Sequence, residues 1–274
     1  MVKLAGLYVY PVKSCRGIAL ERAALTASGL AHDREWMVVG PNGRFLTQRD
    51  TPRLALVAPA LRSEGLVLQA EGMPTLAVAT RTAHEPAVEV IVWDDRCLAR
   101  DEGPDAARWL SELLGRESRL VRFDPSRPRP TDRTWSQGIA GETRFSDGFP
   151  LLVLSQASLD DLNARLPAPL PLDRFRPNLL LEGCEPYAED SLGSFKLGRA
   201  MLRAVKPCTR CVVTTTDQRT AARDGEEPLR TLKTYRWNAA LRGVTFGQNV
   251  IVESPGEVTL EIGMPVVQPA ASQS

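Results

Sequence analysis

Short apolar segments separated by turn-forming residues fill the first hundred positions, and this pattern restricts that half of the chain to a mostly antiparallel β structure. Residues 35–39 and 44–47 flank the turn sequence Gly-Pro-Asn-Gly, in which Asn-Gly supplies the positive φ angles of a tight hairpin. Residues 66–69 and 75–79 flank a second turn, and residues 88–93 alternate again between apolar and other side chains. The sequence therefore predicts a series of β-hairpins.

A short amphipathic helix follows these hairpins. Residues 105–114 place Trp109, Leu110 and Leu113 on one face, and Gly115 can end the last turn. The periodicity predicts a helix that packs on the sheet through this face.

Residues 124–133 are rich in proline and charge and cannot form the interior of a sheet. We take this stretch as the boundary between an N-terminal domain, residues 1–123, and a C-terminal domain, residues 124–268, with a flexible tail at 269–274. The C-terminal domain again reads as mainly β (α+β). The predicted helices are one that opens at Ser158 with a capping-box pattern and one over 228–237, and the predicted strands are 150–154, 178–182, 200–205, 211–216, 249–253 and 258–262.

The balance of charge argues against a general attraction to nucleic acid or to anionic lipid. The chain has 34 basic and 33 acidic side chains, so any anion site must be local. Arg127, Arg129 and Arg133 share one loop with Asp124 and Asp132, without the interleaved aromatic side chains that single strands require. We expect no nucleic-acid partner.

The N-terminus and the cysteines favour a cytoplasmic location. The first ten residues are apolar for only a few positions before Pro11 and Lys13, which is too short for a secretory signal or a membrane span. The 5 cysteines are an odd number scattered through a chain that is long enough to fold without disulfides. We expect reduced thiols and no membrane span.

Two N-terminal segments carry groups suited to an anionic ligand. Lys13, Ser14 and Gly17 follow the first strand directly, where an ammonium, a hydroxyl and a flexible backbone can surround a phosphate. A solvated surface turn explains the same residues equally well. Arg34 is as ambiguous, because an arginine at the entry of a strand often pairs with a neighbouring carboxylate such as Asp33.

Two further segments lie in the C-terminal half. Arg174 and Arg176 precede an apolar strand, where guanidinium groups can grip phosphate with two parallel hydrogen bonds and Asn178 can recognise the edge of a heterocycle. Structural salt bridges are a comparable alternative. The backbone amides around Gly148 and Phe149 are also candidates, although this segment taken alone is merely a turn.

The most informative stretch is Cys208-Thr209-Arg210-Cys211, for which three chemistries compete. Half of a zinc site is one alternative, but no second pair of ligands occurs at zinc spacing. A dithiol redox pair is another, although Cys211 begins a run of β-branched residues instead of a helix. The third is a single thiolate ligand beside fixed positive charge, an arrangement that suits a soft, anionic metal cofactor.

Several motifs together, in order along nearly the whole chain, identify a resemblance. The chain resembles MOSC-domain proteins of the molybdenum-cofactor type, close to the mitochondrial amidoxime-reducing component and its bacterial counterparts. The segments that carry this resemblance are 10–17, 33–34, 147–150, 175–178, 208–211, 227–233 and 246–249.

The resemblance implies an N-terminal MOSC-associated β-barrel half, then a MOSC β-barrel with a few peripheral helices, and the molybdenum cofactor held between them. Cys211 would be the protein thiolate on molybdenum, and Cys208 would serve in packing. The residues that would hold the pyranopterin and its phosphate are Lys13, Ser14, Arg34, Arg176, Asn178, Thr209 and Arg210, with the backbone of Gly148 and Phe149 and the side chain of Asn249 nearby.

The implied activity is an oxidoreductase that reduces N-hydroxylated compounds, such as amidoximes or hydroxylamino bases, to amines. The alternative is a non-catalytic protein that carries the molybdenum cofactor, or carries sulfur as a Cys211 persulfide. The sequence has no cysteine spacing of a plant-type ferredoxin cluster before it stops at Ser274. We therefore expect a separate electron donor, a flavin reductase with a ferredoxin or a cytochrome b5-like carrier. Pyridoxal phosphate is a further ligand that the resemblance brings into consideration.

Overall fold

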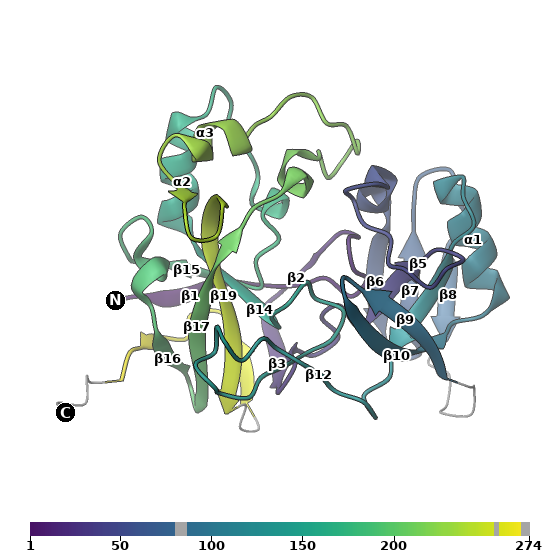
Figure 1. Cartoon of the computed structure of the whole chain (residues 1–274), viewed down its shortest axis with the longest axis horizontal. Helices are drawn as coiled ribbons and strands as arrows, with labels where there is room; N and C mark the ends of the chain where they lie inside the picture. The colour runs from purple at the N-terminus through teal and green to yellow at the C-terminus, as the bar shows by residue number, and fades with distance from the viewer. Residues whose placement is uncertain (80–86, 255–257, 270–274) are drawn as a thin grey trace.

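The computed structural model divides the chain into two β-rich parts that lie side by side (Figure 1). It describes residues 1–79, 87–254 and 258–269, so the predicted tail at 269–274 lies almost entirely outside the described residues. Strands predominate and the described residues form three short α-helices, which confirms the predicted mainly β class.

The larger part is built on a nine-stranded sheet. Its central strand β14 (Leu151–Ser155) is buried at every position, as expected for an apolar run covered on both faces. β14 runs parallel to β15, and the other neighbours are antiparallel. The strand order is β2 (Ile18–Leu20), β1 (Lys3–Val9), β15 (Leu179–Glu182), β14, β19 (Gly243–Ser254), β17 (Ala200–Thr209), β16 (Ser194–Leu197) and β21 (Val266–Val267), and β18 (Trp237–Asn238) pairs with β19.

The smaller part contains the predicted hairpins and carries α1 (Pro104–Leu114) on one side (Figure 1). Trp109 and Leu110 of α1 are buried in the same apolar cluster as Trp36 and Leu66. The sheets of this part are β5 (Trp36–Val39), β11 (Arg119–Phe123), β10 (Asp95–Asp101) and β9 (Ala87–Val92), and separately β6 (Ala58–Arg62), β7 (Gly65–Gln69) and β8 (Leu76–Ala79).

The first strands of the chain pair with the C-terminal half. β1 is hydrogen-bonded to β15, and β3 (Arg22–Thr26) lies between β4 (Gly29–Leu30) and β20 (Val258–Glu261). The segment between residues 9 and 18 therefore leaves the larger sheet, passes the smaller part and returns, which places its residues at the junction of the two parts. The domain boundary at residues 123 and 124 stays a prediction; the stretch around it holds only the short pair β12 (Arg129–Pro130) and β13 (Glu142–Thr143).

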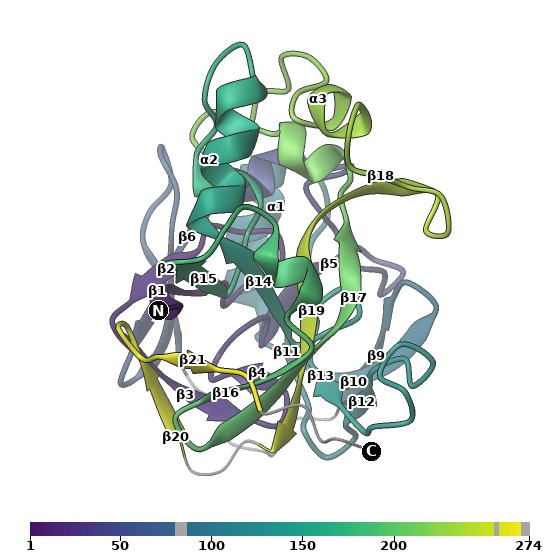
Figure 2. The ribbon, with the colours of Figure 1, turned by 90° about the vertical axis from the view of Figure 1, so that its left-hand side faces the viewer.

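The helix predictions are confirmed in position but not in every boundary. α1 has proline at its first turn and ends at Gly115 in the left-handed region, φ 67°. α2 (Gln156–Arg165) is capped by Ser155, not Ser158: the Ser158 amide donates to Ser155 Oγ at 3.1 Å. α3 (Leu229–Lys233) is shorter than predicted, because the chain turns after it and enters β18 at Trp237. Figure 2 shows α2 and α3 together at one end of the larger sheet, where they cover β14 and β19.

Two predicted strands are wrong. Residues 211–216 form a 3-10 turn, η4 (Val212–Thr215), with Cys211 as its N-cap. Thr214 Oγ1 donates to the Cys211 carbonyl at 2.9 Å and Thr215 Oγ1 to the Val212 carbonyl at 2.8 Å, so the hydroxyls satisfy carbonyls that a strand would offer to its neighbour. Residues 44–47 form no regular strand, but they complete the predicted hairpin through an antiparallel bridge between Val39 and Phe45, with the Leu46 amide donating to the Val38 carbonyl at 2.8 Å.

Candidate functional site

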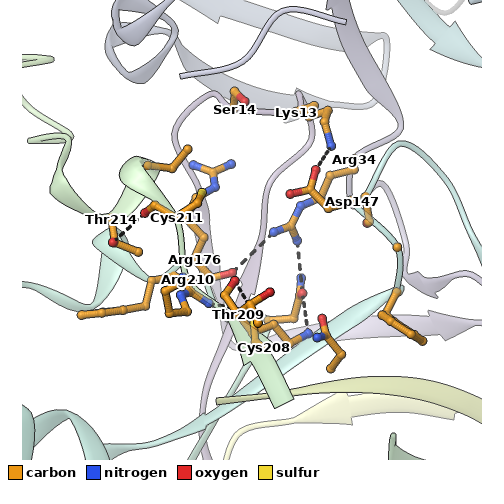
Figure 3. Close-up of a pocket in the computed structure, with 18 of the residues that line it drawn as sticks. Lys13, Ser14, Arg34, Asp147, Arg176, Cys208, Thr209, Arg210, Cys211 and Thr214 are labelled. Atoms are coloured by element: carbon orange, nitrogen blue, oxygen red, sulfur yellow. Dashed lines mark hydrogen bonds and ion pairs between the residues drawn. The ribbon is translucent and has the colours of Figure 1, made fainter. Parts of the chain in front are cut away.

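One pocket brings together every residue that the sequence assigned to the site (Figure 3). Its walls come from the segment after β1, the Arg34 turn, the loop before β14, the start of β15, the end of β17 with η4, and β19. The predicted clustering of these distant segments is therefore present, whereas their individual roles stay predictions.

Lys13 and Asp147 form an ion pair at one side of the pocket, in which the lysine is buried and the carboxylate is exposed. Lys13 Nζ donates to Asp147 Oδ1 at 2.5 Å and to the Phe145 carbonyl at 2.7 Å, and its side chain is 7% exposed. Burial lowers the pKa of Lys13 to about 8, although Asp147 opposes that shift. The Asp147 carboxylate opens toward the pocket; burial alone would raise its pKa, but Lys13 and Arg49 hold it well below its usual range.

Arg49 is a member of the site that the sequence analysis missed. Its Nη2 donates to Asp147 Oδ2 at 3.2 Å, and its guanidinium lies 4.6 Å from the centre of the Trp93 ring. Burial would lower the pKa of Arg49, but the neighbouring Asp147 and the Cys211 thiol, to which it is hydrogen-bonded, raise it. In the sequence, Arg49 is only a polar residue after a predicted hairpin. Its approach to Cys211 depends on the tertiary fold, so no local pattern indicates it.

Arg34 is held in place from three sides. Its Nη1 donates to Asp33 Oδ2 at 2.6 Å and to Asn178 Oδ1 at 3.1 Å, and its guanidinium lies 4.3 Å from the centre of the Tyr10 ring. The pairing with Asp33 that the sequence left open is thus present. Arg34, Ser14 and Arg176 all have positive φ (45°, 68° and 56°), a conformation that is uncommon for side chains other than glycine and concentrates at functional sites.

Asn178 acts mainly on its protein neighbours. Its Oδ1 accepts hydrogen bonds from Arg34 and from the Leu152 amide, and its Nδ2 donates to the Tyr8 carbonyl at 3.1 Å. The residue is 1% exposed. These bonds fix Arg34 against β14, so the geometry favours a positioning role over the predicted recognition of a heterocycle edge.

Arg176 and Arg210 keep unused donors beside the pocket. Arg176 Nη1 donates to the Cys15 carbonyl at 2.7 Å, while Arg176 Nη2 is buried without a partner among the described residues. Arg210 Nη2 donates to the Phe175 carbonyl at 2.7 Å, and Arg210 Nε is equally buried and unpaired within the described ranges. Burial and the charge of Arg34 lower the pKa of Arg176 to about 10. A bound anion would satisfy both groups.

The two cysteines of the motif both line this pocket. Cys211 stands where β17 gives way to η4, and its carbonyl accepts from the Thr214 amide at 3.0 Å, which fixes the backbone that carries the thiol. Cys208 was expected only to pack, but it is half-buried and its Sγ accepts a hydrogen bond from Arg210 Nη1 at 3.0 Å. Thr209 between them is exposed at the end of β17.

The remaining predicted residues, Gly148, Phe149 and Asn249, line the same pocket. Gly148 and Phe149 are half-buried, and a Cβ added at Gly148 would meet nothing within 4 Å, so the backbone there faces open space. Asn249 Nδ2 donates to the Lys206 carbonyl at 3.2 Å, which ties the wall to β17. Arg129 supports the loop from behind, since its Nη1 donates to the Ser146 carbonyl at 2.5 Å.

The residues described by the structure contain no group of three or more His, Cys, Asp or Glu side chains that could hold a metal ion on their own. Cys208 and Cys211 therefore have no partners there for a zinc site. No helix within the described ranges is long and apolar enough to cross a membrane.

Comparison with known proteins assigns the family. The family model described as the MOSC N-terminal beta barrel domain matches residues 1–117, and that of the MOSC domain matches residues 140–267. Mitochondrial amidoxime-reducing component 1 of Mus musculus is 39% identical over 96% of this chain and 81% of its own length. The human protein of the same name is 37% identical over 96% and 82%. The chain belongs to the family of the mitochondrial amidoxime-reducing components.

Membership of this family gives the pocket its chemical context. MOSC domains are associated with binding of the molybdenum cofactor, and the relatives are named for reduction of amidoximes. The same names place those relatives in mitochondria, so the cytoplasmic location expected from this sequence stays a prediction.

Proposed function

We propose that this chain is a molybdenum-cofactor-dependent oxidoreductase that reduces N-hydroxylated compounds, such as amidoximes or hydroxylamino bases, to the parent amines. The observation that supports it most strongly is the pocket itself, in which the Cys211 thiol shares one space with Arg176 and Arg210. The reduction consumes two electrons and two protons and releases one water for each amine formed.

The donor set of the pocket fits the proposed cofactor. The unpaired Arg176 Nη2 and Arg210 Nε call for an anionic group, as the cofactor phosphate is, and the backbone at Gly148 leaves room beside them. A thiolate is the ligand type that soft, sulfur-bonded metal centres prefer. Cys211 would ligate the metal, and the two arginines with Thr209 and Ser14 would hold the pterin and phosphate.

When bound, the cofactor supplies the change of oxidation state and accepts the oxygen of the substrate. The side chains of this chain orient the cofactor and neutralise its phosphate. Lys13 holds a proton on Nζ at neutral pH, because its pKa is about 8, and Asp147 keeps that ammonium at the edge of the pocket. Arg49 places a second fixed positive charge beside the Cys211 thiol.

The electrons come from outside this chain in our proposal, through a flavin reductase with a ferredoxin or a cytochrome b5-like carrier. Pyridoxal phosphate is not part of the proposal, since no relative named above carries it in its name.

The test measures molybdenum per chain in protein made by a host that synthesises the cofactor. We expect near-stoichiometric molybdenum in the native chain, loss of most of it in Cys211→Ser, and retention in Cys208→Ser, which removes the other thiol of the same pocket. Equal molybdenum in native protein and Cys211→Ser would contradict the ligand assignment.

Turnover separates an enzyme from a carrier. The loaded and chemically reduced protein should oxidise a reduced artificial dye when an amidoxime is added. A carrier of cofactor would instead leave the dye reduced and release molybdenum cofactor to an apo-enzyme, and a sulfur carrier would show persulfide on Cys211.

A further inference from the structure

A second pocket lies behind the first and shares only Arg176 with it. It lies between the β1–β2 connection, the segment that leads into η2 (Leu172–Arg174), and residues 218 and 219. The Tyr10 ring and the Arg176 guanidinium, 4.3 Å from its centre, form the partition between the two pockets. Nothing in the proposed reaction uses this space.

The floor of the second pocket is largely apolar. Pro171, Leu172 and Ala19 contribute aliphatic surface, and the half-buried ring of Tyr8 contributes a flat face. A Cβ at Gly17 would lie 2.5 Å from the Tyr10 ring, so glycine at this position keeps the ring and the rim open. Such a surface suits a flat apolar body.

The charge around this floor is predominantly positive. Arg16, Arg176 and Arg219 all reach the pocket, against one carboxyl group, Asp173. Arg16 Nε donates to the Ala55 carbonyl at 3.1 Å, which fixes the side chain, while no hydrogen bond from its terminal nitrogens is found within the described ranges. No ion pair joins any of the three arginines to a carboxylate in the part of the chain that the structure describes.

Asp173 offsets only part of this charge, since one carboxyl group faces three arginines. Burial raises its pKa despite the neighbouring Arg174, and the residue makes no ion pair among the described residues. Arg174 itself is committed elsewhere, with Nη1 on the Thr215 carbonyl at 2.8 Å and Nη2 on Asp217 Oδ2 at 3.0 Å.

We propose that the second pocket binds a small organic anion, a carboxylate or phosphate carried on a flat apolar body. Arg16 and Arg219 grip the anionic group, because planar guanidinium groups match both headgroups with paired hydrogen bonds. Tyr8 and Leu172 cover the apolar body. Arg176 lines both pockets, so its positive charge acts on an anion bound in either of them.

The experiment titrates para-fluorobenzoate and para-fluorophenyl phosphate into the protein as purified from a cofactor-making host, observed by fluorine NMR. Acetate and inorganic phosphate, added as competitors of the fluorinated probe, serve as headgroups without a body, and fluorobenzyl alcohol as a body without charge. We expect saturable binding of a fluorinated anion and much weaker binding of all three controls. The probe that binds more tightly shows whether the pocket prefers a carboxylate or a phosphate.

Three variants assign the binding to its pocket. Arg219→Gln should weaken the probe about tenfold, the effect of losing one hydrogen bond to a charged partner. Ala19→Glu, at an exposed position on the floor, should abolish binding by adding a like charge. Arg49 lines the first pocket and not the second, so Arg49→Gln should leave the probe affinity unchanged. Absence of saturable binding, or binding weakened by Arg49→Gln but not by Arg219→Gln, would overturn the proposal, and neither result depends on molybdenum content.

Discussion

The cations of the first pocket fall into two groups that are neutralised differently. On one side, each has a carboxylate: Lys13 Nζ is 2.5 Å from Asp147, Arg49 is 3.2 Å from the same carboxylate, and Arg34 is 2.6 Å from Asp33. We call these three the paired cations. Two carboxylates face these three cations, because Lys13 and Arg49 share Asp147, so the protein neutralises most but not all of their charge.

Arg176 and Arg210 are the open cations. Their described partners are the Cys15 and Phe175 carbonyls and the Cys208 thiol, and each keeps one buried nitrogen without a partner. Carbonyls satisfy hydrogen-bond donors but do not neutralise a charge, so these two arginines remain expensive to bury until an anion arrives.

The difference assigns separate tasks to the two groups. The paired cations stabilise the junction of the two halves of the chain and shape the pocket, whereas the open cations are the ones that gain most from a bound phosphate. The lowered pKa of Arg176, caused by burial and then by Arg34, agrees with this division. Each prediction below tests it on one group.

The largest expected effect is on the stability of the paired group. Asp33→Ala should lower the free energy of unfolding by about 3–5 kcal/mol, because it leaves the Arg34 cation without its carboxylate in a buried site. It also removes the acceptor of the Tyr10 amide, 2.8 Å away. Chemical denaturation measures the change.

The matched control is Glu89→Ala, which breaks the exposed ion pair with Arg96 and should cost less than about 1 kcal/mol. A cost for Asp33→Ala no larger than this control would mean that the pairing of Arg34 contributes nothing, and the two groups of cations would then not differ.

The next effect is on anion binding by the open group. Arg210→Gln should weaken sulfate binding to the cofactor-free protein about tenfold, since it removes a charged donor with an unpaired nitrogen. Arg49→Gln should weaken it less than about threefold, because Asp147 already neutralises Arg49. Calorimetry in an Arg219→Gln background keeps the second pocket out of the measurement. The reverse order of the two losses would contradict the comparison.

The sequence predicted Lys13, Arg34, Arg176 and Arg210 as one set and missed Arg49, because only those four stand in a motif at a strand end or turn whose local signal is readable. The turn at Gly43, Gly115 at the end of α1 and the apolar run of β14 are likewise local, and the structure contains them, although Asn42 does not share the positive φ (71°) of Gly43. The sequence could not decide that Arg34 is paired with a carboxylate while Arg176 is not, because both are arginines before an apolar strand.

The failures have two physical causes, one local and one long-range. Residues 211–216 have high strand propensity, but the Thr214 and Thr215 hydroxyls bond to carbonyls three residues earlier and close a 3-10 turn instead. Arg49 reaches Asp147 and Cys211 only because the two halves of the chain meet there. Contacts between distant segments leave no pattern in a single sequence.

A third prediction concerns the hydrogen bonds of Gln48, the residue that precedes Arg49. Gln48 and Gln218, both buried, exchange two hydrogen bonds between their amides at 2.9 and 3.0 Å, and Gln48 Nε2 also donates to the Ser14 carbonyl at 2.7 Å. Gln218→Leu leaves the Gln48 amide partly unpaired and should cost about 1–3 kcal/mol in unfolding free energy.

The double variant Gln48→Leu with Gln218→Leu should recover part of that cost, because it removes both partners of the exchange together. Strictly additive losses would show that the two amides are not coupled, and Arg49 would then owe its position to Asp147 alone.

The smallest effect is the pH dependence that Lys13 gives to sulfate binding and to stability. Burial lowers the Lys13 pKa from its ordinary 10.5 to about 8 in the protein without ligand, so Lys13 loses its charge as the pH rises through 8. Sulfate keeps a constant charge over this range, and its affinity should therefore fall a few-fold between about pH 7 and about pH 9. Lys13→Gln should bind weakly at both pH values, and Lys13→Arg, which stays charged, should show little change.

Stability of the same ligand-free protein should move in the opposite direction. Between pH 8 and 10.5 the unfolded chain holds more protons at Lys13 than the folded chain does, so this residue makes the free energy of unfolding rise with pH across that window. A sulfate affinity that falls while stability rises identifies Lys13 as a buried cation whose charge serves the ligand. If both quantities fell together, Asp147 would stabilise the charged form of Lys13 by more than burial destabilises it. The charge of Lys13 would then stabilise the fold instead of serving the ligand.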